Sequence, residues 1–396
     1  MTSLDDTMGA APVAVAALEH DASVGRDMPA VDFQREVYAV LGLPVDAIDM
    51  GGAVAKLRRA ALTNTPCMVS TPNLNFAVNA LTDAAFRHSV VTSDLSLADG
   101  MPLVWVARLL GLPIRQRVSG AGVFEALAAH APPAVTVFFF GGPDGAAHAA
   151  CQRVNATASG LRCVGFAAPG FGTLQQMSAE AYIERINASG AQFVVAALGA
   201  QKGQAWLQRN RTRLVAPVRC HLGAVVNFAA GTVRRAPALL QHAGLEWLWR
   251  IAEEPALWKR YALDGLVFLR LLLLDVLPLA WSMRRSRASA EALQEAGVAT
   301  AVAGDVCTLS LTGAWTQSNL QPLRTALTKG AASARRLRLV LYDVSHVDSA
   351  FIGLLMLAPR AFPLGMEIVG AQPALVRRLR RHRADHLLAP AGGAHA

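Results

Sequence analysis

The residues with the clearest chemical potential lie in a turn. Residues 92–104 read TSDLSLADGMPLV, so that Asp99 and Gly100 stand directly before an apolar helical pattern. A carboxylate in a half-buried pocket has a raised pKa and can take the proton of an attacking hydroxyl group. An aspartate here can also simply cap the helix that we expect over 101–110, and the residue types alone favour the cap. Gly100 lets the backbone approach a substrate, or only permits the turn.

Further polar and glycine-bearing turns follow expected strands. Thr71 and Asn73 offer a hydroxyl and an amide that can orient a sugar or a leaving phosphate. The alternative is a Thr–Pro–Asn turn that caps the next helix. Gly141 and Gly142 lie between a strand and a helix, which suits contact with a nucleotide through backbone N–H groups. A tight turn explains these two glycines equally well.

Three more polar residues follow the last expected strand of this region. Asn227 stands at the end of that strand, 219–228. Arg234 and Arg235 could neutralise a diphosphate as it leaves. An arginine pair is more often plain surface charge, so this role depends on where the two side chains lie.

Secondary-structure elements must hold these turns in place. The sequence alternates short apolar runs with helical patterns. We expect strands over 67–71, 135–142, 162–167, 192–199 and 219–228, and helices over 73–83, 102–111, 122–131, 145–156 and 178–190. Apolar strands that alternate with helices indicate βαβ units and a parallel sheet covered on both faces. Such sheets bind ligands at the carboxyl ends of their strands, where the turns above fall.

Composition narrows the class of protein. The chain has 396 residues, is 53% hydrophobic, carries a net charge of +9 and has a mean hydropathy of +0.33. A basic chain suits nucleic acid, an anionic membrane surface or a phosphorylated substrate. Its five cysteines include no CxxC pair, so we expect neither a disulfide framework nor a zinc site, and a reducing cytoplasm. No GxxxxGK[ST], HExxH, GxSxG or DxD pattern occurs, and we expect no metal and no cofactor.

Residues 244–287 combine tryptophan, arginine and lysine with a long apolar run. The run from Tyr261 to Trp281 is nearly long enough to span a bilayer, but Asp264, Arg270 and Asp275 interrupt it. Aromatic residues and basic flanks favour a helix that lies in the membrane interface. The alternative is a buried helix that packs on the sheet.

The pattern restarts after a Ser/Ala-rich stretch. We expect strands over 305–313, 337–344 and 365–371 and helices over 319–330, 349–362 and 373–388, which together form a small α/β domain. The basic run RRLRRHR (377–383) could contact nucleic acid or anionic lipid, and without a recognition motif a solvated or lipid-facing helix is the better interpretation.

Six ordered motifs resemble the WecG/TagA/CpsF glycosyltransferases, glycosyltransferase family 26. They are TPNLNFAVNAL (71–81), ADGMPLVWVARLLG (98–111), RVSGAGVFEAL (117–127), FFFGGPDG (138–145), LGAQKGQAW (198–206) and GAVVNFAAGTVRRAP (223–237), and GLEWLWRIAEEPALWKRY (244–261) resembles the closing segment. The resemblance implies transfer, with inversion and without a metal, from a UDP-sugar to a polyprenyl-diphosphate-linked saccharide at the cytoplasmic membrane face.

The resemblance also implies roles for single residues. Asp99 matches the position of the base, and with this match we favour the base over the cap. Thr71 and Asn73 match the T-x-N motif, and the counterpart of Asn227 lies near the nucleotide. In the 199–204 run only Lys202 matches the family, and Gly122 stands where an acid is frequent, so the donor sugar is not carried over.

The stretch VLYDVSHVDSAFIGLLML (340–357) resembles a STAS domain of the anti-sigma-antagonist type. In some members the serine that opens the helix is phosphorylated, and Ser349 is its counterpart. A phosphate there would benefit from the helix dipole. The alternative, which we favour, is that Asp348 or Ser349 only caps the helix. The resemblance suggests a docking or regulatory module with a protein partner.

Together these observations predict a Rossmann-like, mostly parallel α/β domain with a helical membrane-associated appendage and a small α/β STAS-like domain. The expected division is a disordered leader (1–34), the transferase domain (35–243), the appendage (244–287), a linker (288–302) and the STAS-like domain (303–390). We expect an inverting glycosyltransferase of surface polysaccharide synthesis that is peripheral to the cytoplasmic face of the inner membrane and binds no nucleic acid. The alternative is a degenerate transferase that serves as a membrane-bound scaffold.

Overall fold

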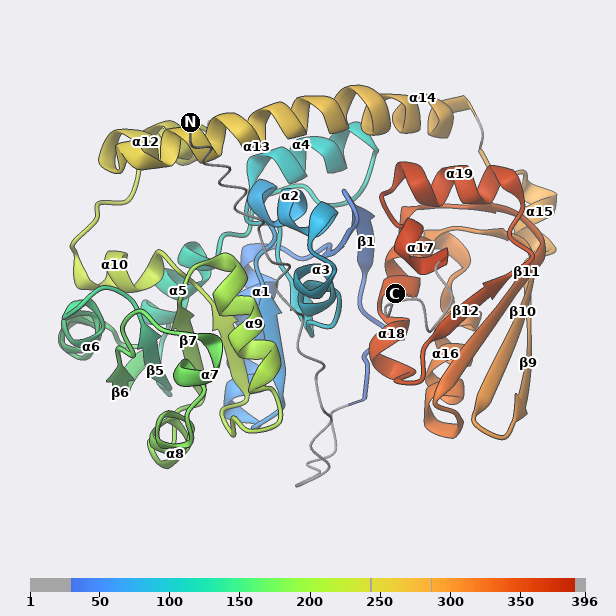
Figure 1. Cartoon of the computed structure of the whole chain (residues 1–396). Helices are drawn as coiled ribbons and strands as arrows, with labels where there is room; N and C mark the ends of the chain where they lie inside the picture. Colours follow the sequence, from blue (N-terminus) through green and yellow to red (C-terminus); the bar gives the residue numbers. More distant parts are fainter. Residues whose placement is uncertain (1–29, 243, 286, 389–396) are drawn as a thin grey trace, which may run out of the picture.

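The structure, a computed structural model, describes residues 30–242, 244–285 and 287–388. It places a six-stranded and a four-stranded sheet side by side beneath one long helix (Figure 1). Residues 1–29 of the expected leader lie outside the described residues. The end of that leader is not disordered, because Phe33 is 2% exposed and packs in a hydrophobic core. Burial of such an aromatic ring contributes roughly 2 kcal/mol, which fixes the chain from this point on.

The first sheet confirms the expected parallel architecture. Its six strands have the order β4-β3-β8-β7-β5-β6, and all its pairs are parallel. Val137 and Phe139 of β5 face one core while Phe138 and Phe140 face another, so helices cover both faces. The strands are β3 (Cys67–Ser70), β4 (Leu95–Ser96), β5 (Val135–Gly141), β6 (Leu161–Ala167), β7 (Phe193–Ala197) and β8 (Val218–His221).

The helices of this domain agree with the expected pattern and extend it. They are α1 (Met50–Leu62), α2 (Leu74–Thr82), α3 (Ala84–Val91), α4 (Met101–Leu109), α5 (Gly120–Ala128), α6 (Ala146–Thr157), α7 (Leu174–Met177), α8 (Glu180–Ala188), α9 (Ala200–Arg209), α10 (Val225–Ala230) and α11 (Ala238–His242).

Two expectations about this domain are wrong. The strand expected over 219–228 ends at His221, and Asn227 lies in α10. A short apolar run does not distinguish a buried strand from a buried helix by periodicity, which explains the error. A disulfide joins Cys151 of α6 to Cys163 of β6, although no cysteine motif indicated one. The helix and the next strand bring these two residues together across a separation that no CxxC pattern covers.

A long apolar helix lies across the top of the molecule (Figure 1). It begins at Pro255 and ends at Arg285, and comprises a 3-10 turn (Pro255–Leu257), α13 (Trp258–Leu271), a π-helical turn (Leu272–Val276) and α14 (Leu277–Arg285). A shorter helix, α12 (Glu246–Glu253), precedes it. We call the segment from α12 to α14 the appendage.

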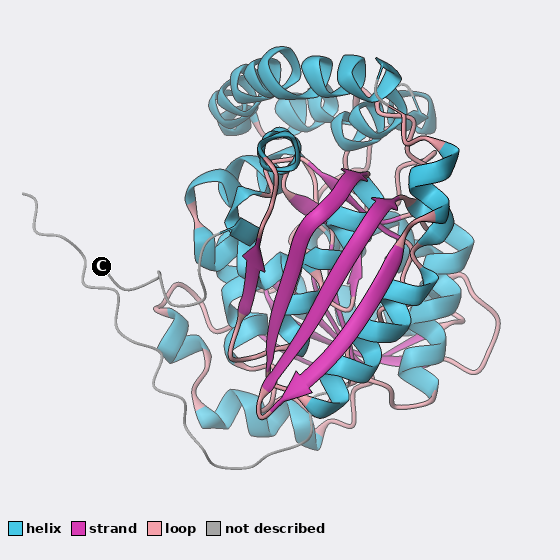
Figure 2. Cartoon of the chain, turned by 90° about the vertical axis from the view of Figure 1, so that its right-hand side faces the viewer, coloured by secondary structure: helices cyan, strands magenta, loops and turns pink. Residues whose placement is uncertain are grey.

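The second sheet forms the C-terminal domain, with the order β12-β11-β10-β9. Its elements are α15 (Ala290–Gln294), β9 (Gly297–Ala303), β10 (Val306–Trp315), α16 (Gln321–Ser333), β11 (Arg336–Val347), α17 (Ser349–Met356), α18 (Ala358–Ala361), β12 (Met366–Val369) and α19 (Pro373–Arg381). No helix of the described residues covers one face of this sheet (Figure 2). The expected linker over 288–302 is wrong, because Ser289 caps α15 and β9 pairs antiparallel with β10.

An N-terminal hairpin joins the two domains. Its strands β1 (Val37–Val40) and β2 (Leu43–Asp46) pack on α17, where a Cβ at Gly353 would lie 2.6 Å from the carbonyl oxygen of Val37. Arg324 of α16 donates to the carbonyl oxygens of Phe33 and Arg35. One hydrophobic core contains residues of the hairpin, the appendage and the C-terminal domain. The C-terminal domain is thus packed into the molecule along a shared core.

Candidate active site

Asp99 lies on the loop between β4 and α4, at the carboxyl end of the parallel sheet. Its backbone N–H donates to Pro72 O at 2.8 Å, which ties this loop to the turn after β3. Its Oδ2 accepts the Gly120 N–H at 3.2 Å, and its Oδ1 lies 3.4 Å from Nη2 of Arg117. The alternative interpretation, in which Asp99 caps the helix expected over 101–110, is wrong, because Gly100 is the N-cap of α4 and makes no side-chain bond. The carboxylate faces the N-terminus of α5 instead.

Burial makes Asp99 a better base than an exposed aspartate. Its side chain is 18% exposed, and burial raises its pKa to about 6. The Arg117 guanidinium and the Gly120 N–H lower this pKa, while the carboxylate of Glu246 raises it. A carboxylate with a pKa near neutrality is largely ionised at pH 7 and still has appreciable affinity for a proton.

Thr71 and Asn73 lie beside two glycines next to Asp99, Gly120 and Gly100. Gly120 stands against the Thr71 side chain, because a Cβ there would lie 3.2 Å from the Thr71 Cγ2 atom. Likewise, a Cβ at Gly100 would lie 3.2 Å from the Asn73 Cβ atom. Asn73 also caps α2, since its Oδ1 accepts the Phe76 N–H at 3.1 Å. The structure therefore brings together the turns after β3 and β4. The side-chain oxygen of Asn73 is occupied by the cap of α2.

Gly141 and Gly142 form a tight turn after β5. Both have φ of 92°, and a Cβ at Gly141 would lie 2.7 Å from Ala197 O. The Gly142 N–H donates to Ala197 O at 2.9 Å, so this N–H is already used in the sheet. The geometry explains both glycines by the turn, as the alternative expectation stated.

The other expected binding residues lie in different surroundings. Asn227 lies on α10, and its Oδ1 is buried with no hydrogen-bond partner among the described residues. Lys202 is exposed on α9, and its Nζ donates to Gly172 O at 3.1 Å. Arg234 is exposed and its carbonyl oxygen accepts the indole N–H of Trp249. Arg235 reaches the start of α5, where its Nη2 donates to Ser119 Oγ at 3.2 Å.

Two functional candidates were absent from the sequence-based set. Arg117 pairs with Asp99 and also with Glu246, the first residue of α12. Arg117 opens the RVSGAGVFEAL motif, so its membership of that motif is the signal that could have pointed to it. Glu246 is 129 residues away from Arg117 in the chain, and no local pattern indicates their contact.

The appendage is held to both domains by its acidic residues. Asp264 is 6% exposed and accepts from Nδ2 of Asn75 on α2 at 3.2 Å. Asp275 pairs with Arg383, which follows α19, at 2.6 Å. Two of the three charges that interrupt the apolar run therefore face the protein, and Arg270 is exposed.

The opposite face of this helix is apolar and open. Of its most apolar 18-residue window, with a mean hydropathy of 1.9, only 22% is buried. The exposed apolar side chains are those of Trp258, Leu263, Leu266, Leu269, Leu273, Leu274, Leu277 and Trp281. By length and composition this helix is long enough to cross a membrane.

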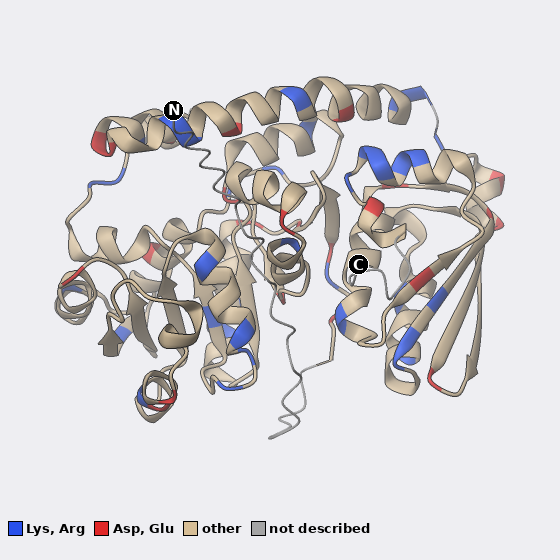
Figure 3. Ribbon diagram, viewed as in Figure 1, with Lys and Arg blue, Asp and Glu red and all other residues tan. Residues whose placement is uncertain are grey.

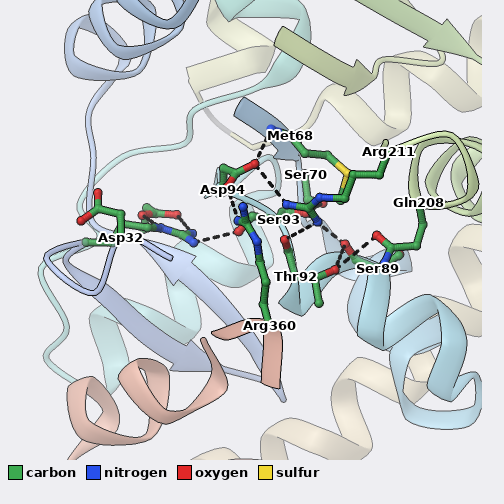
Figure 4. A network of polar contacts seen from close by, with 12 residues as sticks. Asp32, Met68, Ser70, Ser89, Thr92, Ser93, Asp94, Gln208, Arg211 and Arg360 are labelled. Atoms are coloured by element: carbon green, nitrogen blue, oxygen red, sulfur yellow. Dashed lines mark hydrogen bonds and ion pairs between the residues drawn. The ribbon is translucent and has the colours of Figure 1, made fainter. Parts of the chain in front are cut away.

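A buried polar network connects the strands of the site to the C-terminal domain (Figure 4). Asp94, directly before β4, accepts the Met68 N–H of β3 at 2.7 Å and pairs with Arg211 at 3.3 Å. Arg360 of α18 forms a third contact with the same carboxylate. The side chains of Arg360 and Asp94 are 8% and 16% exposed. The C-terminal domain thus takes part in fixing the two strands that precede Thr71 and Asp99.

Ser349 lies inside this molecule rather than on its surface. It is 1% exposed, and its Oγ donates to Ala39 O of the hairpin at 2.9 Å. Asp348 caps α17 by accepting the Phe351 N–H at 2.9 Å. The favoured interpretation, a helix cap, is confirmed at Asp348. Phosphorylation of Ser349, the less favoured interpretation, is at odds with this placement, because a kinase cannot reach the hydroxyl while the hairpin is packed on α17.

Comparison with known proteins agrees with this architecture. Residues 38–281 match the model of the glycosyl transferase WecG/TagA/CpsF family, and residues 298–389 match that of the Mlab, STAS domain. The chain belongs to the WecG/TagA/CpsF family of glycosyltransferases and carries a C-terminal STAS-like domain. A similar protein is the N-acetylglucosaminyldiphosphoundecaprenol N-acetyl-beta-D-mannosaminyltransferase of Bacillus spizizenii. It is 27% identical over 198 residues, which are 50% of this chain and 75% of the relative.

Proposed function

We propose that this protein is an inverting glycosyltransferase that moves a sugar from a UDP-sugar to a polyprenyl-diphosphate-linked saccharide, with Asp99 as the base. The observation that carries the proposal is the half-buried Asp99 carboxylate, whose pKa is raised to about 6 at the carboxyl end of the parallel sheet. The name of the Bacillus relative supports the acceptor class, because that enzyme acts on a sugar attached to a diphosphoundecaprenol.

The proposed reaction is a single displacement. The acceptor hydroxyl oxygen bonds to the anomeric carbon of the donor, while the bond from that carbon to the diphosphate breaks and UDP leaves with the electron pair. The hydroxyl proton passes to the Asp99 carboxylate. Arg117 keeps this carboxylate oriented through the contact of 3.4 Å.

The residues around Asp99 have supporting roles in this proposal. The Thr71 hydroxyl and the Nδ2 group of Asn73 orient the substrates, since Oδ1 of Asn73 is used by the α2 cap. Arg235, held at the start of α5, stabilises the negative charge of the leaving diphosphate. Asn227, whose family counterpart lies near the nucleotide, and Lys202, which matches the family at its position, would contact the donor, and Arg234 would act with Arg235 on the diphosphate. Gly141 and Gly142 serve the turn after β5 and receive no separate contact with the donor in this proposal.

We further propose that the protein lies on the cytoplasmic face of the inner membrane and serves surface polysaccharide synthesis. The appendage presents its exposed leucines and tryptophans to the lipid while Asp264 and Asp275 hold its other face on the protein. A helix held in this way lies in the interface and does not span the bilayer. This position brings a lipid-anchored acceptor next to a water-soluble donor.

The proposal is tested by measuring UDP release from a panel of UDP-sugars, with and without membranes that carry polyprenyl-diphosphate-linked saccharides. We expect release with one donor that depends on the acceptor. If no donor is turned over by protein that still binds membranes, the scaffold function gains support instead. The departures from the family in the 199–204 run are the feature that favours this second function.

A further inference from the structure

The helix α19 of the STAS-like domain has two sharply different faces. Leu375 and Leu379, one helical turn apart, are 6% and 1% exposed and pack into the shared core. Arg377 and Arg380 are exposed on the other side, and Arg381 is half-buried. The glycosyltransferase chemistry described above makes no use of these arginines. Their positive charge needs a different explanation.

This basic helix lies next to the end of the apolar helix of the appendage. Arg383, two residues after α19, pairs with Asp275 at 2.6 Å, which fixes the two helices against each other. In Figure 1 α14 and α19 lie together at the top of the molecule, and Figure 3 shows that both carry basic residues there. Arg284 and Arg285 at the end of α14 are exposed, as is Arg287.

We define the basic surface as these residues of α14, α19 and the segment between α14 and α15: Arg284, Arg285, Arg287, Arg377, Arg380 and Arg381. The exposed acidic residues close to it in the chain are Glu291, Glu295 and Asp385, and Asp275 is neutralised by Arg383. The basic surface continues the exposed apolar face of the appendage. At the junction, Trp281 is 57% exposed, and the Arg285 guanidinium lies 3.9 Å from its ring centre.

An apolar strip that ends in a basic surface fits a membrane with anionic headgroups. Transfer of leucine and tryptophan side chains from water into the hydrocarbon of a bilayer is favourable. Arginines at headgroup depth attract anionic lipids. A nucleic acid would satisfy the arginines and leave the adjacent leucines in water. The combination of the two surfaces therefore favours a lipid partner.

We propose that the STAS-like domain is itself a membrane contact, in which the arginines of α19 bind the headgroups of anionic phospholipids beside the appendage. This inference rests on the proposed membrane attachment. It gives the C-terminal domain a role in orienting the site, because α19 and the appendage would contact the same bilayer on either side of the Asp275–Arg383 ion pair.

The test measures binding of the full chain to vesicles of phosphatidylcholine alone and of phosphatidylcholine mixed with phosphatidylglycerol. The variant carries Arg377→Gln, Arg380→Gln and Arg381→Gln. The control carries Arg162→Gln, Arg335→Gln and Arg336→Gln, which removes the same charge from exposed positions on β6 and at the start of β11. Thermal unfolding confirms that both variants are folded.

We expect the α19 variant to lose affinity for the mixed vesicles by on the order of 100-fold at low salt and to bind phosphatidylcholine like the wild type. The control should lose only a few-fold. An equal loss in both variants, or no loss in either, overturns the inference. So does a competition with inorganic phosphate, at constant ionic strength, that displaces the protein from vesicles at millimolar concentration, because the arginines would then bind free phosphate.

Two further outcomes are distinguishable. A wild type that binds neither kind of vesicle contradicts the proposed membrane attachment and this inference together. A wild type that binds the mixed vesicles through the appendage, with α19 irrelevant, contradicts this inference alone. If the α19 variant loses affinity for duplex DNA and keeps its affinity for vesicles, the basic surface binds nucleic acid instead.

Discussion

Arg117 and Glu246 form an ion pair that joins the candidate base to the appendage. The same guanidinium lies 3.4 Å from Asp99, so the first residue of α12 acts on the base through one arginine. The side chains of Arg117, Asp99 and Glu246 are 18%, 18% and 14% exposed, so water screens their mutual interaction only partly. The position of the appendage and the proton affinity of Asp99 are therefore linked.

The first prediction concerns the pH dependence of the wild type. Asp99 must be ionised to accept a proton, and burial raises its pKa to about 6. We expect kcat/KM to rise with pH along a limb with an apparent pKa near 6 and to level off above pH 7. Initial rates between pH 4.5 and 8 measure this limb. A limb near pH 4 would show that Asp99 is not desolvated in this way.

The second prediction is that two substitutions shift the apparent pKa of kcat/KM in opposite directions. Arg117 lowers the pKa of Asp99 and Glu246 raises it. Arg117→Gln should therefore move the limb to higher pH, and Glu246→Gln should move it to lower pH. Both substitutions keep a polar, hydrogen-bonding side chain and remove the charge. Shifts in the same direction in the two variants would contradict the electrostatic link, whatever happens to the maximal rate.

The third prediction is that Asp99→Asn stabilises the folded protein at high pH. The folded pKa of about 6 exceeds the ordinary value of 3.8, so the stability that Asp99 contributes is complete below pH 3.8 and is lost as the pH rises through 6. Asparagine removes this loss. We expect a free energy of unfolding larger than that of the wild type by up to about 3 kcal/mol at pH 8, and a difference that shrinks toward pH 4. Urea unfolding at several pH values measures it, and a difference independent of pH would refute the argument.

The fourth prediction concerns the ion pair between the two domains. Arg360→Ala leaves the buried Asp94 carboxylate with Arg211 and the Met68 N–H as partners. Loss of one partner from a buried pair is costly, and we expect a loss of about 2–4 kcal/mol in the free energy of unfolding.

Arg338→Ala is the matched control for this substitution. It removes an arginine from an ion pair with Glu367 whose side chains are 50% and 43% exposed. We expect a loss of less than about 1 kcal/mol. Equal effects of Arg360→Ala and Arg338→Ala would show that the network around Asp94 does not support the strands of the site.

Much of the fold could be predicted from the sequence because its patterns are local. The parallel strands have apolar runs as their sequence pattern. The observed bounds of β5, β6 and β7 lie within about two residues of the expected ones. The error at Asn227 arose where a buried strand continues directly into a buried helix, and both give apolar runs. The linker over 288–302 was misjudged because small residues such as those of β9 occur in edge strands as well as in links.

The sequence could predict only those residues of the site that lie in short motifs. Asp99, Thr71 and Asn73 could be proposed because each follows an apolar run and also matches a motif of the family that the sequence resembles; the local pattern alone favours a helix cap for Asp99. The role of the Gly142 N–H could not be seen, since its partner Ala197 belongs to another strand. Contacts between distant segments, such as Arg117 with Glu246 or Ser349 with Ala39, follow from tertiary packing and leave no mark on local sequence.

The role of Asp99 as the base is tested by comparing acceptor-dependent transfer by the wild type, by Asp99→Asn and by Asp305→Asn. Asp305 is an exposed aspartate between β9 and β10, so its substitution controls for the loss of one carboxylate. We expect Asp99→Asn to be folded and slower by 10²- to 10⁴-fold, on the order expected for a general base, while Asp305→Asn matches the wild type. A folded Asp99→Asn protein that transfers sugar at the wild-type rate would contradict the central claim that Asp99 takes the proton.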